Sequence, residues 1–309
     1  MSDLLLQPDV REPLQASFSE QANPIGLDGI EFIEYATSRP QALGHVLQMM
    51  GFQPVARHRS REVQLYRQGA INVIVNAHPT DSQGAERGTT VPGISAIAVR
   101  VRDARAAYRY VLERGAWEVP THPEAMELNI QAIHGAGGSR IHFIDRYDEF
   151  SIHDVDFVTI PSVDQQPPAL AGMHLFGIVQ YIGAGRSHDW IEFYGELFGT
   201  ALIPDDQRFG IMPAGKLLRT PGLQPANRFM LQLIEPQADS FDSTERLQRI
   251  GLGVPDVPDV LAAVRALRAR GMELVESEAA HTGQRGAISK TYLGGVVFEL
   301  VHSERAQAS

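Results

Sequence analysis

Cysteine is absent from this chain, and long apolar runs are absent too. Without cysteine, no disulfide, thiolate metal site or cysteine nucleophile can form, so a metal would have to be bound by His, Asp, Glu, Asn, Gln or Tyr. No apolar run approaches the roughly 20 residues that cross a bilayer. No basic region precedes an apolar stretch at the N-terminus, so we expect no secretory signal. We therefore expect a cytoplasmic protein that has no membrane partner.

Positive charge is also scarce. The chain has 27 Lys and Arg against 37 Asp and Glu, which gives a formal net charge of −10. A nucleic-acid partner requires a basic face that compensates the phosphates, so we do not expect one. The hydrophobic content of 43% is ordinary for a globular protein and suffices for a sizeable core.

What the chain does have is an internal repeat. The segment GISAIAVRVRDARAAYRYVLERGAWEV (93–119) aligns with LQRIGLGVPDVPDVLAAVRALRARGMELV (247–275). Each segment has an alternating strand, an Asp near a helix start and a helix with apolar residues at three-to-four spacing. Each then has a glycine, Gly115 or Gly271, where a left-handed conformation ends the helix. The two segments therefore predict the same strand–helix–strand unit.

A second pair of segments, 26–59 and 171–204, is more diverged but has the same pattern. Its helices are expected to end at Gly51 and Gly199. The serines near the helix starts, which are the expected caps, are Ser38 and Ser187. Short strands follow each helix, and FSIHDVDFV (150–158) is also interpreted as a strand. The chain thus contains four similar units, which form two pairs.

One helix and a few strands cannot bury both faces of a small sheet, so two units are expected to join into a curved, open sheet with its helices outside. This predicts an α+β fold with tandem βαβββ units that form two curved open-barrel domains. The Pro-rich segment around 160–172 is the expected linker. The expected boundaries are an N-terminal tail (1–23), an N-terminal domain (24–160), a linker (161–170), a C-terminal domain (171–303) and a tail (304–309).

The repeated unit resembles the vicinal oxygen chelate, or glyoxalase-like, superfamily, and the chain resembles bacterial 4-hydroxyphenylpyruvate dioxygenases. In the N-terminal half the resemblance is carried by NPIGLDGIEFIEYA (23–36), MELNIQAIHGAGGSRIHFIDRY (126–147) and SIHDVDFV (151–158). In the C-terminal half it is carried by GMHLFGIVQYIGAGRSHDWIEFYGELFG (172–199) and SKTYLGGVVFELV (289–301). It covers nearly the whole chain.

The resemblance implies an Fe(II) ion bound in the C-terminal half by two histidines and one glutamate, and another divalent metal is the alternative. Three ligands on one side of the metal leave open positions for a 2-oxo acid and dioxygen. His174 falls on the first histidine position and Glu299 on the glutamate position. The function that the resemblance implies is that of a non-haem Fe(II) dioxygenase acting on an aromatic 2-oxo acid.

Arg249 stands where the resemblance implies the second histidine. A guanidinium has no lone pair to donate to a metal. At about 4 Å from a dication its repulsion would be on the order of 8 kcal/mol at an effective dielectric near 20. We therefore expect Arg249 to form an ion pair with Glu299. The other residues expected at this cavity are Gln232 and Tyr292 for substrate binding, and His281 as an alternative third metal ligand.

Two further functions remain open. In a metal-free relative, Arg249 would bind an anionic substrate, and His174 or Glu299 would act as the acid–base group of a lyase or isomerase. The alternative is a ligand-binding protein without catalysis. In each case the expected partner is a small carboxylic or 2-oxo acid, and a homo-oligomer remains open as well.

The N-terminal half lacks the ligand set. It has Glu31 and Ala96 at the strand positions that match the C-terminal site, so we expect this half to be structural. His142 and His153 are expected to be ordinary strand or turn residues. A register shift of one residue in the C-terminal strand would turn Arg249 outward and direct Gln248 into the cavity.

Overall fold

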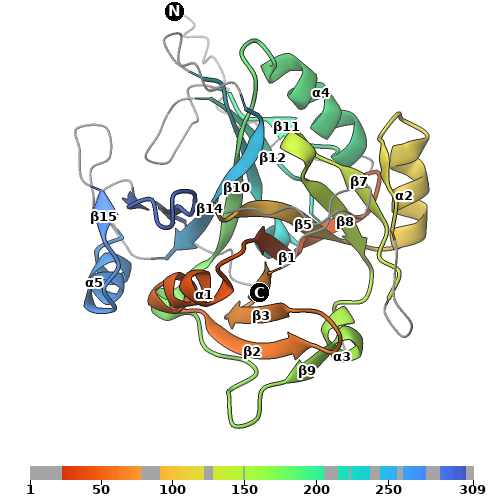
Figure 1. Cartoon of the computed structure of the whole chain (residues 1–309). Coiled ribbons are helices and arrows are strands. Elements are labelled where there is room, and N and C mark those ends of the chain that lie inside the picture. The colour runs from red at the N-terminus through yellow and green to blue at the C-terminus, as the bar shows by residue number, and fades with distance from the viewer. Residues whose placement is uncertain are drawn as a thin grey trace, which may run out of the picture.

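The computed structural model describes residues 23–77, 91–121, 128–148, 150–204, 215–222, 224–236, 244–255, 260–275 and 286–303. Within these ranges the chain forms four consecutive units in which a strand, a helix and three strands follow one another (Figure 1). The repeat that is visible in the sequence is therefore a repeat of structure.

Two of these units form the N-terminal half. The first comprises β1 (Leu27–Ala36), α1 (Pro40–Met49), β2 (Gln53–His58), β3 (Val63–Gln68) and β4 (Ile71–Asn76). The second comprises β5 (Gly93–Val101), α2 (Ala104–Leu112), β6 (Glu118–Val119), β7 (Ala132–His134) and β8 (Arg140–Ile144), followed by α3 (Ile152–Asp156) and β9 (Phe157–Thr159). β1 pairs in parallel with β4 and antiparallel with β5, and β5 pairs in parallel with β8. The units thus join through their first strands.

The C-terminal half repeats this pairing. Its first unit comprises β10 (His174–Tyr181), α4 (Ser187–Phe198), β11 (Ala201–Leu202), β12 (Lys216–Arg219) and β13 (Met230–Ile234). Its second comprises β14 (Arg246–Val254), α5 (Leu261–Ala269), β15 (Leu274–Val275), β16 (Gly286–Ser289) and β17 (Phe298–His302). β10 pairs in parallel with β13 and antiparallel with β14, and β14 pairs in parallel with β17. The predicted α+β fold of tandem βαβββ units is confirmed.

The halves meet at their central strands and through their helices. Leu247 of β14 pairs with Ile94 of β5. Figure 1 shows α2 beside α4 on one side and α1 beside α5 on the other. The Tyr110 hydroxyl donates to the Glu196 carbonyl across the first helix pair, and Arg270 donates to the Gln48 carbonyl across the second. The expected domain boundaries at 160 and 171 stay predictions.

The glycines that were expected to end the helices all adopt left-handed backbone. Their φ angles are 98° at Gly51, 86° at Gly115, 69° at Gly199 and 89° at Gly271. An L side chain is disfavoured at such angles, so glycine fixes each helix end. Among the helices that the structure describes, none combines the length and the apolar character that crossing a bilayer requires.

Three local predictions were wrong. The N-cap of α1 is Arg39, with no side-chain cap, rather than Ser38. Ser187 is the first residue of α4 and donates its hydroxyl to Glu235 at 2.6 Å. The segment 150–158 is mostly the helix α3, because the Ser151 backbone N–H and hydroxyl both donate to Asp154 and stabilise a helix start there.

Candidate functional site

In the C-terminal half, a buried ion pair occupies the place of the predicted metal site. Arg249 on β14 is 2% exposed and Glu299 on β17 is 4% exposed. Arg249 Nε donates to Glu299 Oε2 at 2.8 Å, so the expected ion pair is present. Gln248 instead lies half-buried and accepts from Arg246 Nε, so the alternative register is wrong.

The cavity beside this ion pair is small. Glu299 and Gln232 line it together with Phe176, Met230 and Val301, and its volume is about 20 Å³. A water molecule needs about 10–15 Å³ by the same measure, so the space holds about one water. An aromatic acid would enter only if the surrounding side chains moved.

The other predicted site residues lie apart from this cavity. His174 begins β10 opposite Gly253 and lines a different cavity of about 190 Å³, to which residues of both halves contribute. The Tyr292 hydroxyl accepts from the backbone N–H of Glu273 at 2.7 Å. His281 lies outside the described residues. The functional roles of these residues stay predictions.

The described residues also do not assemble a metal-ligand set. Within the described ranges, no group of three or more His, Asp or Glu side chains is close enough to hold an ion. Arg249 explains this in the C-terminal half, because its guanidinium directs an N–H at the carboxylate oxygen that a metal would need.

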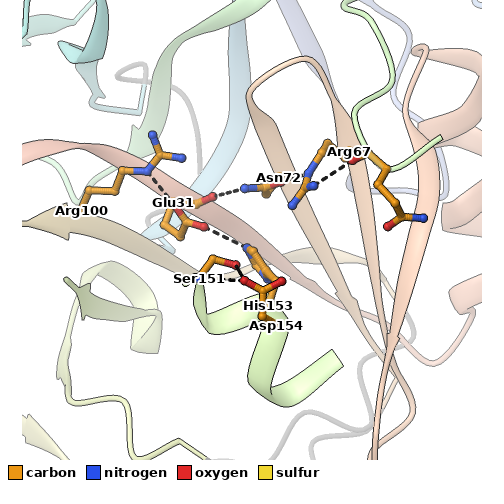
Figure 2. Close-up of polar contacts among 8 residues, drawn as sticks. Glu31, Arg67, Asn72, Arg100, Ser151, His153 and Asp154 are labelled. Atoms are coloured by element: carbon orange, nitrogen blue, oxygen red, sulfur yellow. Dashed lines mark hydrogen bonds and ion pairs between the residues drawn. The ribbon is translucent and has the colours of Figure 1, made fainter. Parts of the chain in front are cut away.

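A second polar cluster lies in the N-terminal half and is centred on Glu31 (Figure 2). Glu31 is 2% exposed and lies where the register of β1 against β5 shifts, between Ile30 and Phe32. Such a bulge redirects a side chain. Glu31 accepts from Arg100 Nε at 2.6 Å and lies 2.9 Å from His153 Nε2.

These contacts set the charge of Glu31. Burial by itself raises the pKa of this carboxyl group. The hydrogen bond with His153 and the positive charge of Arg100 together lower the pKa by more than burial raises it, so the pKa lies below its ordinary value. An ionised carboxylate only accepts hydrogen bonds, so His153 Nε2 carries the proton that it shares with Glu31. His153 Nδ1 is buried and has no hydrogen-bond partner among the described residues.

Asn72 and Arg67 extend the cluster along β3 and β4, as Figure 2 shows. Asn72 donates to the Glu31 carbonyl at 2.9 Å and accepts from Arg67 Nε at 2.8 Å. Arg67 also donates through its Nη1 to the Gln165 carbonyl at 2.9 Å. The amide of Asn72 thus connects the β1 backbone at Glu31 to the Arg67 guanidinium and positions the Arg67 side chain.

This cluster lines a cavity of about 440 Å³, which is in the size range of small-molecule sites. Its polar wall contains Glu31, Arg67, Asn72, Arg100 and His153, and its apolar wall contains Val55, Ala56 and Leu65. Convergent polar groups on a partly apolar cavity are typical of a ligand site.

Sequence reasoning missed this cluster. Glu31 was placed at the strand position that matches the C-terminal site, which was the available signal. Its partner His153 is 122 positions away and was assigned to a strand or turn, whereas it lies on α3. Arg67 and Asn72 carry no motif. Only the fold brings these residues together.

Comparisons with known proteins agree with this fold and identify proteins of similar sequence and structure. Residues 21–158 match the family model described as hydroxyphenylpyruvate dioxygenase, HPPD, N-terminal. A 4-hydroxyphenylpyruvate dioxygenase from Pseudomonas sp. (strain P.J. 874) is 42% identical over 178 residues, which are 57% of this chain and 50% of that protein. The chain thus matches about half the length of this relative.

A 4-hydroxyphenylpyruvate dioxygenase from Pseudomonas aeruginosa is 31% identical over 272 residues, which are 84% of this chain and 74% of that protein. The structure is also similar to that of a mutant 4-hydroxymandelate synthase from Streptomyces coelicolor, with a TM-score of 0.68 at 15% identity. That alignment covers 92% of this chain and 95% of the other, and it shows the shared fold.

Proposed function

The chain belongs to the 4-hydroxyphenylpyruvate dioxygenase family, and we propose that it acts on an aromatic 2-oxo acid in its C-terminal half. The observation that carries this proposal is the match to the Pseudomonas aeruginosa enzyme through both halves of the chain, at 31% identity over 272 residues. Glu299 and Gln232 support it, because they line one cavity on the sheet of the C-terminal half.

The resemblance implies Fe(II) for such a reaction, and the residues as they lie do not fit that ion. The ion would need two imidazoles and a carboxylate on one side. One imidazole position is Arg249, whose Nε hydrogen-bonds the carboxylate, and His174 lines another cavity.

The residues at this position neutralise the charge of Glu299 and leave little space beside it. Arg249 neutralises Glu299, and Glu299 lines a space of only about 20 Å³, so a substrate entering there has to displace the surrounding side chains. If the pair opens, the guanidinium offers a planar fork to the substrate carboxylate. A second candidate function, in which Arg249 recognises an anionic substrate without metal for lyase or isomerase chemistry or for binding alone, requires this opening of the ion pair.

Oxygen uptake by the full chain with 4-hydroxyphenylpyruvate and added Fe(II) tests the proposal, with Arg249→His as the comparison. Restoring an imidazole removes the cation and adds a ligand, so we expect Arg249→His to bind iron more tightly and to consume oxygen at least about tenfold faster than the unaltered chain. Iron content after gel filtration and calorimetry with 4-hydroxyphenylpyruvate complete the measurement.

The outcomes separate the candidates. Equal iron content and equal oxygen uptake in both proteins would show that Arg249 does not hinder the metal. Binding of 4-hydroxyphenylpyruvate that needs Arg249 but gives no oxygen uptake supports the metal-free function. Failure of both proteins to bind 4-hydroxyphenylpyruvate would overturn the proposed substrate.

A further inference from the structure

We propose that the cavity of the N-terminal half binds a small organic monocarboxylate between Arg67 and Arg100. This site is independent of the proposed function, because none of its lining residues belongs to the predicted site in the C-terminal half. It is also the roomier of the two, at about 440 Å³ against about 20 Å³.

The first argument is the supply of hydrogen-bond donors. Arg67 uses Nε and Nη1 for Asn72 and Gln165, and Arg100 uses Nε for Glu31. Nη2 of Arg67 and both terminal nitrogens of Arg100 make no hydrogen bond with the described residues. A guanidinium fork matches the two oxygens of a carboxylate.

The second argument is the charge of Arg67. Among the described residues, no carboxylate lies within ion-pair distance of its guanidinium, although Glu31 and Asp154 act on it from farther away. Burial lowers the pKa of Arg67, and the positive charge of Arg100 lowers it as well. A partly buried cation that senses a second cation is stabilised by an anion placed between them.

The third argument selects the ligand's charge. Two arginines and three carboxylates, Glu31, Asp148 and Asp154, line the cavity. Asp148 and Asp154 are exposed and screened by water, whereas Glu31 is buried and already neutralised by Arg100. Of the two guanidiniums, that of Arg67 is the one without an ion-pair partner among the described residues, because Arg100 is paired with Glu31. A singly charged carboxylate suits this balance better than a phosphate with nearly two negative charges.

The fourth argument concerns the rest of the ligand. Val55, Ala56 and Leu65 offer an apolar wall to a carbon skeleton. The Tyr147 ring, which Arg100 covers at 5.3 Å, lies at the same cavity. The buried Nδ1 of His153 lacks a partner among the described residues, as is typical of a group that a ligand or water satisfies. The ligand class is therefore a hydroxylated or aromatic monocarboxylic acid.

Calorimetry on the full chain tests the site with three probes, namely benzoate, 4-hydroxybenzoate and lactate, and with inorganic phosphate as the comparison. We expect at least one monocarboxylate to bind more tightly than phosphate. Arg67→Gln should weaken that binding about tenfold or more, because it removes a charge-assisted hydrogen bond. Arg57→Gln is the matched control, since Arg57 is exposed on β2, outside the cavity, and its loss changes the net charge equally.

Two further variants make the result decisive. Arg67→Lys keeps the positive charge but loses the planar fork, so its affinity for the probe should lie between those of the unaltered chain and Arg67→Gln. If the glutamine variant fails to fold, the lysine variant replaces it in the test. Arg249→His reports on the C-terminal site: a probe whose binding this variant weakens while Arg67→Gln does not is bound in the C-terminal half, which would overturn the assignment to this cavity. The proposal is overturned if no probe binds, if phosphate binds best, or if Arg57→Gln and Arg67→Gln weaken binding equally.

Discussion

Both halves of the molecule bury a glutamate against an arginine in a sheet of the same topology, yet the two pairs have different surroundings. In the C-terminal half Arg249 is 2% exposed, and the adjoining space is about 20 Å³. In the N-terminal half the Arg100 side chain is 21% exposed and adjoins a cavity of about 440 Å³. The half in which the sequence predicted the metal ligands is the closed one. A ligand can therefore reach the N-terminal ion pair through its cavity, whereas it can reach the C-terminal pair only if side chains move.

The largest expected difference between the halves is in the cost of losing the glutamate. Glu299→Leu removes the buried carboxylate that accepts from Arg249 Nε, so we expect the free energy of unfolding to fall by about 3–5 kcal/mol. Glu31→Leu should cost less, about 2 kcal/mol, because Arg100 can turn its charge toward water through the cavity. Urea unfolding of both variants measures the difference.

The double variant Arg249→Met with Glu299→Leu is the control for this comparison. It replaces the pair with apolar side chains of similar size, so most of the lost stability should return. Equal costs for Glu299→Leu and Glu31→Leu would show that the cavity gives Arg100 no relief, and the contrast between the halves would then be wrong.

The sequence predicted the parts of this comparison that depend on local pattern. The four units and the helix ends at Gly51, Gly115, Gly199 and Gly271 follow from spacing and from glycine chemistry. The Arg249–Glu299 pair follows from electrostatics once the register is known, because neither charge can be buried alone. The helix ends need only neighbouring residues and the repeat, whereas the ion pair across 50 positions was predicted because the family resemblance places both residues at one site.

The N-terminal cluster needs the tertiary structure. Glu31 points to His153 and Arg100 because of a bulge in β1, and no periodic pattern encodes a bulge. His153 was expected to be an ordinary strand or turn residue, whereas the Ser151–Asp154 cap starts a helix there. A contact across 122 positions is set by how the elements pack.

The position in the N-terminal half that is equivalent to Glu299 provides a second test of the difference between the two halves. Gly251 pairs with Glu299 between β14 and β17, and Ala98 pairs with His142 between β5 and β8, so His142 occupies that position in the N-terminal half. Burial and the nearby charge of Arg140 lower the pKa of His142 to about 4. Glu34 opposes this shift without reversing it.

Because the unfolded chain binds this proton near pH 6.5 and the folded chain only near pH 4, acidification between these values favours unfolding. The loss reaches at most about 3 kcal/mol. His142→Gln should flatten the fall in stability over this range while leaving stability above pH 7 nearly unchanged. Urea unfolding at pH 4.5, 5.5 and 7.5 measures it, and equal slopes for both proteins would assign the acid sensitivity to other groups.

The smallest expected effect concerns the helices that follow β5 and β14. Asp103 caps α2 by accepting from the Ala106 N–H at 2.9 Å, whereas the N-cap of α5 is the buried Val260 and has no side-chain cap. Asp103→Ala should therefore lower the free energy of unfolding by about 1 kcal/mol, because it leaves a helix N–H without its partner. Asp103→Asn keeps an accepting oxygen and should cost only a few tenths of that. Urea unfolding of the two variants distinguishes the cap from the charge: if the asparagine variant loses as much stability as the alanine variant, the negative charge at the helix start, rather than the hydrogen bond, accounts for the contribution of Asp103.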